Sequence, residues 1–415
     1  MTQPRFRAAL TLALLASLPA SAGAQTSVTF DQALALGARA APVQVPAREL
    51  AARAAGDPGI GGTAQATTIT LMPGAVVAPQ QESGFEMQAS ITQGWNLADL
   101  GSSRRRAAAE ERAVLAAQVR AEALRARLEA ARRWIELAAS QGVEQVLIDA
   151  SAIAAERVAR SERALEAGVG DAASLATARA AQAEIAQARL DAEGERFTAG
   201  LQLAAAMGEP GRRDLVARGS LPSPALPDLE SARASLRDLD ALPDLAVRRL
   251  AASAARAREV EVRAGYAPIL SVGAQVERGA SDAWVVYGIA SLSFSAFGQE
   301  DRAASEASGA AEREEARLDV ARDQARTELE DALHEVEHTR EQLEALDHAL
   351  LPALQTLADR RRLAMERGEG TVFEHLDAQA RLTQARALRV RSLAARVWAE
   401  VRLWLHLAEV AGARS

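Results

Sequence analysis

The stretch LAMERGEGTVFEHLDAQAR, Leu363–Arg381, decides the fold, because it repeats in diverged form the earlier stretch ALEAGVGDAASLATARAAQ, Ala164–Gln182. At a shift of 200 residues the small residues of the two stretches coincide: Gly168 with Gly368, Gly170 with Gly370, and Ala178 with Ala378. Upstream, Gly101 falls on Gly298 at a nearly equal shift. A nearly constant shift over separate segments indicates a tandem duplication.

Each copy contains one very long segment that reads as a helix. Residues 102–167 and 299–367 are poor in glycine and rich in alanine, arginine and glutamate. A helix rises 1.5 Å per residue, so each segment predicts a helix of about 100 Å. Ordinary globular helices are several times shorter. The sequence therefore predicts a mainly α protein built from long packed helices.

Apolar and small residues in the second copy follow a coiled-coil spacing. Seven-residue steps connect Leu329, Val336, Leu343, Leu350, Leu357 and Ala364. After the glycine turn, alternating steps of three and four connect Leu376, Ala380, Thr383, Ala387, Val390, Ala394, Val397, Val401 and Trp404. Pro352 lies inside the long segment, where it frees a backbone carbonyl one turn earlier and permits a bend.

Two pairs of short segments predict a small β part. FEMQASITQGWNL, 85–97, and ILSVGAQVE, 269–277, alternate apolar and polar residues, and residues 67–77 and 284–297 provide less regular partners. A sheet that is apolar on one side fits either an outer-membrane barrel wall or a soluble sheet with one buried face. Four strands cannot close a barrel, and lipid does not tolerate an open edge. If these strands lie in a membrane, several chains must share one barrel.

Composition and the N-terminus bound the possible functions. The 415 residues include 3% aromatic residues and no cysteine, which excludes disulfides and lipid attachment at an N-terminal cysteine. Residues 1–24 read as a signal peptide, with basic residues, an apolar run and a small-residue cleavage site. The net charge of -7 argues against nucleic acid as a partner. No later apolar run reaches the length of a membrane-spanning helix.

The sequence HEVEH, His334–His338, resembles the zinc-binding helix of metalloproteases. An enzyme of that class would use His334 and His338 as zinc ligands and Glu335 as the general base. The coiled-coil spacing places all three residues on the flanks of the helix, and a catalytic zinc needs a third protein ligand. We expect neither an enzyme nor a bound metal or cofactor. A soluble periplasmic coiled-coil adaptor or scaffold is a further alternative.

Over nearly the whole mature chain, the sequence resembles the outer-membrane efflux protein family, the TolC-like channels. The resemblance rests on the duplicated order, the two turns, the lengths of the long helices and the segment LPDLAVRRLAASAARAREVEVRAGYAPILSV, 242–272. It implies a homotrimer in the outer membrane, with four strands per chain in a shared twelve-stranded β-barrel and the helices continuing as a periplasmic α-barrel. It also implies an exit duct for efflux or type I secretion, working with a periplasmic adaptor and an inner-membrane pump.

The resemblance also implies roles for residues in the two turns, which would form the periplasmic tip. The adaptor would dock at Gly168, Val169, Gly170, Gly368, Glu369 and Gly370. In GEGTVFEHLDA, Glu374 and Asp377 match the acidic positions that narrow the channel, and their mutual repulsion in a threefold ring is expected to raise their pKa values. His375 beside them either binds a metal or is a plain exposed residue.

The sequence departs from the family pattern at three positions near the turns. Met365, Gly370 and Ser174 replace a tyrosine, an arginine and an aspartate that hold some members shut. The chain as a whole is expected to divide into consecutive parts, in this order: signal peptide 1–24, short equatorial helices 25–66, first strand pair 67–97, first helical hairpin 102–208, linker 209–228, helix 229–265, second strand pair 267–297 and second helical hairpin 299–410.

Overall fold

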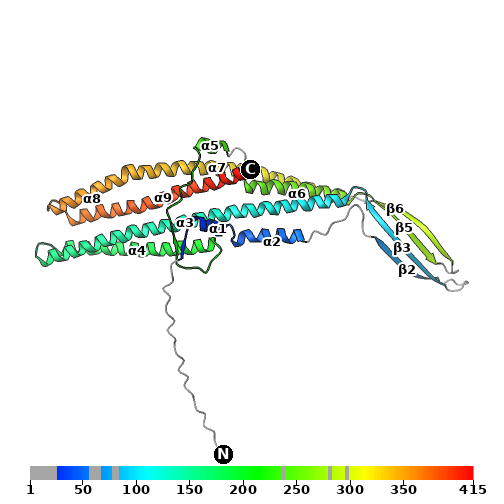
Figure 1. Cartoon of the computed structure of the whole chain (residues 1–415), viewed down its shortest axis with the longest axis horizontal. Coiled ribbons are helices and arrows are strands. Elements are labelled where there is room, and N and C mark those ends of the chain that lie inside the picture. Colours follow the sequence, from blue (N-terminus) through cyan, green and yellow to red (C-terminus); the bar gives the residue numbers. More distant parts are fainter. Residues whose placement is uncertain are drawn as a thin grey trace, which may run out of the picture.

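The computed structural model describes residues 26–55, 67–76, 84–235, 239–278, 283–294 and 299–414. The expected signal peptide, the glycine-rich segment 56–62 and Gly298 lie outside these ranges. The molecule is long and narrow, with two helical hairpins ending at one end and a sheet at the other (Figure 1). About three quarters of it is helical, which confirms the predicted mainly α fold with a small β part.

The elements follow the same order twice. The first copy contains, in chain order, β1 (Thr26–Val28), α1 (Phe30–Gly37), α2 (Ala41–Ala55), β2 (Thr68–Val76), β3 (Gly84–Asn96), α3 (Leu100–Glu166) and α4 (Ala172–Ala206). The second contains β4 (Leu215–Ala217), α5 (Leu229–Ser235), η1 (Leu239–Ala241), α6 (Pro243–Gly265), β5 (Ile269–Arg278), β6 (Trp284–Ser293), α7 (Gln299–Ala345), the π-helix η2 (Leu346–Leu350), α8 (Leu351–Glu366) and α9 (Val372–Arg414).

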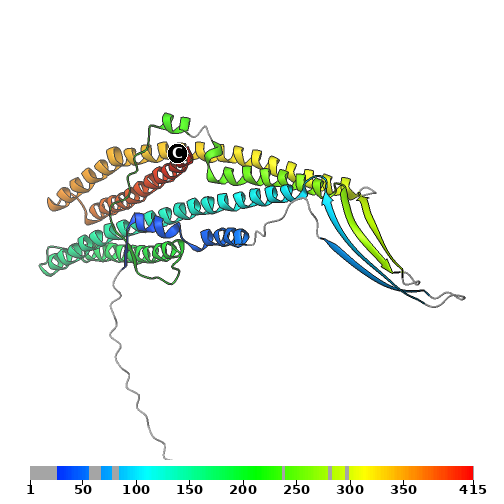
Figure 2. The same ribbon diagram turned by 45° about the vertical axis from the view of Figure 1, so that its right-hand side comes forward.

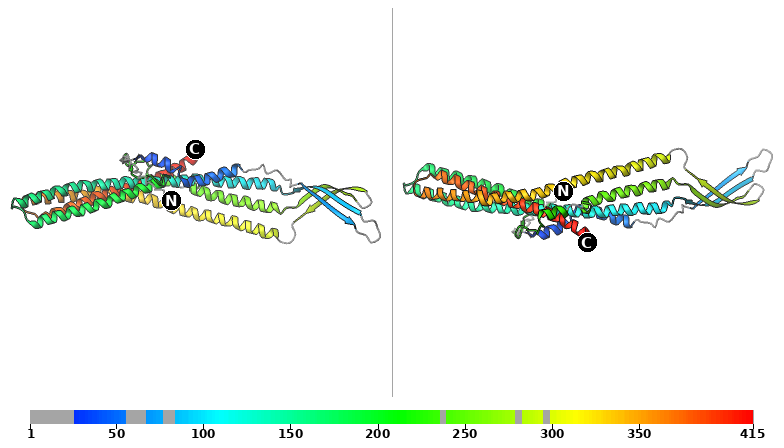
Figure 3. Two further views of the ribbon diagram at one scale, coloured as in Figure 1. Left: turned by 90° about the horizontal axis from the view of Figure 1, so that it is seen from below. Right: turned by 90° about the horizontal axis from the view of Figure 1, so that it is seen from above.

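The long helices lie side by side along the molecule (Figure 3). Helix α3 packs against α4, α6 and α9, and α8 packs against α9. Helices α3 and α9 approach each other closely at Gly142 of α3, where an added Cβ would lie 2.8 Å from Cγ1 of Val390 on α9. A glycine inside a helix is otherwise unfavourable, so its presence here reflects this contact.

The coiled-coil spacing of α7 is confirmed only as far as Leu343, which is buried like Val336. Beyond it the predicted position Leu350 is exposed, and Ala358 is fully buried one residue after the predicted Leu357. The cause is η2, where the N–H of Leu351 donates to the carbonyl of Leu346, five residues earlier. A π-turn adds one residue to the helix and shifts every later side chain. It lies immediately before Pro352, where a bend was expected.

Helix α9 also differs from the predicted spacing near the turn. Ala394, Val397 and Val401 are buried as predicted. Closer to the turn, the buried line that faces α8 contains His375, Ala378, Leu382 and Ala385. The predicted residues Leu376, Ala380 and Thr383 instead line a cavity of about 170 Å³ between α9 and the first hairpin. A helix packed between two neighbours needs two apolar lines, and the predicted spacing corresponds to only one of them.

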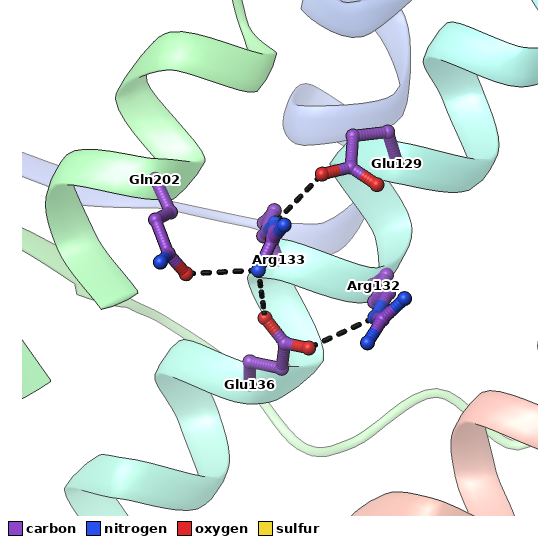
Figure 4. A network of polar contacts seen from close by, with 5 residues as sticks. All are labelled: Glu129, Arg132, Arg133, Glu136 and Gln202. Atoms are coloured by element: carbon purple, nitrogen blue, oxygen red, sulfur yellow. Dashed lines mark hydrogen bonds and ion pairs between the residues drawn. The ribbon is translucent and has the colours of Figure 1, made fainter. Parts of the chain in front are cut away.

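The main core lies near the middle of the molecule, around Trp134 of α3. Its side chain is fully buried, its Nε1–H donates to the carbonyl of Val28 at 2.8 Å, and its ring meets that of Phe30 edge-on. Beside this core, Arg133 joins α3 to α4 by donating to Glu129, Glu136 and Gln202 (Figure 4). These contacts hold the N-terminal segment and the first hairpin together.

Two expectations for the connecting segments need correction. The helix expected over 229–265 is interrupted before Pro243. A proline disfavours helical geometry in the residue before it, so Leu242 is extended and α6 begins at Pro243. The regions expected as short helices and linker also contain the strands β1 and β4, which pair in parallel. Three-residue strands carry too little alternation to be recognised from sequence.

The larger sheet has the order β2-β3-β5-β6, and all of its neighbouring strands are antiparallel. Its strands are inclined to the helices, as Figure 3 shows. Buried Asn96 fixes the junction: its Nδ2 donates to the carbonyl of Ala264 at the end of α6, and its Oδ1 accepts from the N–H of Ala98. Among the described residues, no helix is both long and apolar enough to cross a membrane.

Candidate functional sites at the two ends of the molecule

The two helical turns have the same backbone geometry. Gly168 and Gly368 both have a positive φ, 69° and 73°, a conformation that glycine adopts without strain. The N–H of the following residue, Val169 or Glu369, donates to the carbonyl of Ala164 or Ala364. These are the hydrogen bonds of a glycine-ended helix. Both turns lie at the end of the molecule opposite the sheet (Figure 2).

Residues expected to contact an adaptor lie on the outside of these turns. Val169 is 82% exposed, which is unusual for an apolar side chain, and Glu369 is exposed at the matching position. Gly170 lies so close to Ala164 that an added Cβ would meet it at 3.0 Å. A side chain here would push the end of α3 away, so glycine keeps the turn compact whether or not it contacts an adaptor.

Different side chains cap the helices that leave the two turns. In the first turn, the Asp171 carboxylate accepts from the N–H and hydroxyl of Ser174. In the second, the Glu374 carboxylate accepts from the N–H of Thr371 at 3.1 Å, and the Thr371 hydroxyl accepts from the N–H of Glu374 at 3.2 Å. This reciprocal pair is a capping box. Glu374 thus has a structural role whether or not it faces a channel.

Within one chain, the two acidic side chains expected at the constriction are already paired with arginines. Glu374 lies 3.1 Å from Arg361 of α8, and Asp377 lies 3.0 Å from Arg381, one turn further along α9. Hydrogen bonding from Thr371 and the charge of Arg361 lower the pKa of Glu374. Within the chain this direction is opposite to the rise expected from repulsion around a ring. Neither arginine was predicted to take part in the site, although the four-residue spacing of Asp377 and Arg381 is a recognisable signal of an ion pair on a helix.

His375 is fully buried between α8 and α9, so the expectation that it is an exposed residue is wrong. At the equivalent position the first copy has Leu175, which is also buried. The position of His375 in the duplicated unit therefore predicts its burial better than the polarity of its side chain does. In the described part of the chain, no group of three or more His, Cys, Asp or Glu residues is arranged to hold a metal ion.

The HEVEH segment lies on the exposed flank of α7. The rings of His334 and His338 stack with centroids 5.8 Å apart, and Nε2 of His338 is 2.7 Å from the Gln342 amide. The Glu335 carboxylate forms an ion pair with Arg402. A zinc protease needs a free carboxylate and a third ligand in a closed cleft. This arrangement therefore disfavours the protease alternative.

At the other end, the strand register aligns apolar residues across the four strands. One row contains Leu71, Ala89, Val276 and Val286, and the next contains Ile69, Ile91, Ala274 and Gly288. The opposite face has rows such as Thr70, Ser90, Gln275 and Tyr287. Leu71, Ile69 and Val286 are more than two-thirds exposed, so the apolar face has no cover within the described chain. Among the described residues, the two edge strands, β2 and β6, pair on one side only.

Comparison with solved structures relates this arrangement to known proteins. The CmeC outer membrane channel of Campylobacter jejuni matches with a TM-score of 0.71 and 13% identity, over 92% of this chain and 85% of that chain. The open state of the MtrE outer membrane channel of Neisseria gonorrhoeae matches with a TM-score of 0.71 and 15% identity, over 91% and 88%. The outer membrane protein VceC of Vibrio cholerae matches with a TM-score of 0.70 and 14% identity, over 91% and 95%.

The chain has the fold of the TolC-like outer-membrane channels. In this TolC-like fold, the two glycine turns form one end and the four-stranded sheet forms the other. No protein-family profile matches the chain, and no curated protein matches it in sequence. The fold is therefore established by the whole arrangement of elements.

Proposed function

We propose that three copies of this chain form an outer-membrane exit duct for an efflux or type I secretion system. The observation that carries this proposal is the sheet: in the part of the chain that the structure describes, it combines an uncovered apolar face with two edge strands that pair on one side only. In lipid the apolar face is favourable, and each edge must find a partner strand because its backbone groups would otherwise be unsatisfied.

Closure by identical subunits satisfies both requirements. Strand β2 of one chain would pair with β6 of the next, and three sheets of four strands would give a closed barrel of twelve strands. The in-register apolar rows would face lipid, and the rows of Thr70, Ser90 and Gln275 would face the lumen. The helices would continue the duct into the periplasm. The TolC-like fold of the chain supports the same arrangement.

The helical tips would form the periplasmic mouth of the duct. Gly168, Val169 and Gly170, with their counterparts Gly368, Glu369 and Gly370, would contact a periplasmic adaptor that connects the duct to an inner-membrane pump. Exposed Val169 would provide apolar contact area on one tip. The differing residues, Val169 and Glu369, would let an adaptor distinguish the two tips.

Glu374 and Asp377 would line the narrowest part of this mouth. A ring of carboxylates favours cations. Arg361 and Arg381 would compensate part of that charge, so the mouth would be only weakly cation-selective. Transport through such a duct would need no catalytic group.

Membrane fractionation tests the proposal against the soluble-adaptor alternative. The duct should appear in the outer-membrane fraction, require detergent for extraction and have the mass of three chains. A soluble adaptor would leave the apolar rows of the sheet in water, which is unfavourable. Recovery of the protein in the periplasmic fraction without detergent would refute the duct.

A further inference from the structure

The two hairpin tips have small cores built from equivalent positions. The first contains Val158, Leu175 and Ala178, and the second contains Ala358, His375 and Ala378. Each residue of the second set lies 200 positions after its counterpart. The second core therefore has an imidazole where the first has an isobutyl group, and a smaller neighbour, alanine in place of valine, beside it.

His375 is poorly satisfied in this core. It is 0% exposed, and neither ring nitrogen makes a well-formed hydrogen bond to any residue that the structure describes. A neutral imidazole has one N–H donor and one acceptor, and buried polar groups are nearly always paired. Leucine at the equivalent position shows that the fold does not require a polar group here. The backbone of Ala358 on α8 also favours a protonated ring, but does not meet it in hydrogen-bonding geometry. A buried imidazole with such incomplete pairing calls for an explanation other than packing.

The charges around His375 are mainly positive. Arg157 of α3 and Arg362 of α8 both oppose a positive charge on the imidazole, and Glu366 of α8 favours one. Glu366 is already 3.1 Å from Arg362, which balances much of its charge. Arg157 is itself partly buried, and its Nε–H has no acceptor among the described residues. A proton on His375 would therefore enter a core without a free counter-charge.

We propose that His375 is an acid-sensitive switch that opens the second hairpin tip, and not the first, when the pH falls. The closed tip excludes the protonated imidazole, because the charge would be buried beside Arg157 and Arg362. Opening the α8–α9 contact exposes the ring to water, where it can be protonated. The ends of α8 and α9 beside the glycine turn at 368–370 would separate from each other first.

The direction of the effect follows from proton binding. Burial, reinforced by Arg157, lowers the pKa of His375 to about 4 in the closed tip. In an open, hydrated tip the pKa would return to about 6.5. The closed form is fully favoured above pH 6.5, and between about 6.5 and 4 the open-to-closed ratio rises about tenfold per pH unit fallen. Leu175 gives the first tip no such dependence.

Amide hydrogen exchange on the full chain in detergent tests this inference without relying on channel activity. Opening constants for residues 151–182 and 351–382 are obtained at each pH, after correction for the exchange rate of unstructured peptide. From pH 7.5 to 4.5 we expect opening of the second tip to rise on the order of 50- to 100-fold. Opening of the first tip should stay nearly constant. Equal responses of the two tips would overturn the inference.

Two substitutions identify the responsible group. His375→Leu copies the first tip, and His375→Gln keeps a polar side chain that does not titrate. Both should remove most of the pH dependence of the second tip, leaving only the small acid response of Glu374, whose pKa is lowered in the folded tip. If either folded variant opens on acidification as much as the wild type does, another group is responsible and the proposal is wrong. The reverse transplant, Leu175→His with Val158→Ala, should confer pH-dependent opening on the first tip. A transplanted tip that ignores pH would also contradict the proposal.

Discussion

Arg361 and Glu374 form a 3.1 Å ion pair across the second tip, joining the end of α8 to the start of α9. The same carboxylate caps α9 through Thr371. Glu374 therefore combines a structural contact with the charge proposed for the mouth of the duct. Substitutions can separate these two roles, because glutamine retains the cap and removes the charge.

The first prediction concerns ion selectivity in planar bilayers. Glu374→Gln should lower the cation-to-anion permeability ratio roughly two- to fivefold, because the ring loses its charge. Arg361→Ala should raise the same ratio, since it removes the compensating cation. Arg362→Ala is the matched control, because Arg362 pairs with Glu366 instead. If all three variants conduct like the wild type, Glu374 does not line the constriction.

The second prediction concerns the face of the sheet that is proposed to contact lipid. Ala89→Arg places a charge in an apolar row and should destabilise the membrane-inserted form by about 2–4 kcal/mol near the bilayer centre. Ser90→Arg places the same charge on the opposite face and should have a much smaller effect. The amount of trimer extracted with detergent measures the effect of each substitution. Equal losses would show that the assigned face is wrong.

The third prediction concerns the contact between the two hairpins. Gly142→Ala places a methyl group 2.8 Å from Cγ1 of Val390 and should destabilise the protein by about 1–2 kcal/mol, although alanine favours the helix. Val390→Ala in the same background should restore most of that loss. Thermal unfolding of the single and double variants gives the coupling free energy between positions 142 and 390. Additive losses would mean that the two side chains do not meet.

Sequence alone predicted the features that repeat. The pairs Gly168 with Gly368 and Gly170 with Gly370 located both turns, and the positive φ of Gly168 and Gly368 explains why glycine stands at the end of each helix. The alternation of apolar and polar residues, which is also a local signal, correctly predicted β3 and β5. Such local signals are sufficient to predict a mainly α fold with a small sheet.

Features that depend on contacts between distant residues could not be predicted. The π-turn before Pro352 shifts the buried line by one residue, and the heptad spacing gives no warning of it. Arg361 pairs with Glu374 only because the turn brings α8 against α9. His375 looked like a surface residue by its chemistry, whereas its counterpart Leu175 was the better guide to its burial.

Cross-linking between the two edges of the sheet tests the central claim most directly. The chain has no cysteine, so Thr70→Cys on β2 can be combined in turn with Val285→Cys, Tyr287→Cys or Ile289→Cys on β6. In the pairs whose Cβ atoms lie about 3.5–4.5 Å apart across the subunit boundary, oxidation in membranes should yield covalent dimers and trimers and nothing larger. Ladders that continue beyond three chains, or no intermolecular product from any pair, would contradict closure of one barrel by three subunits.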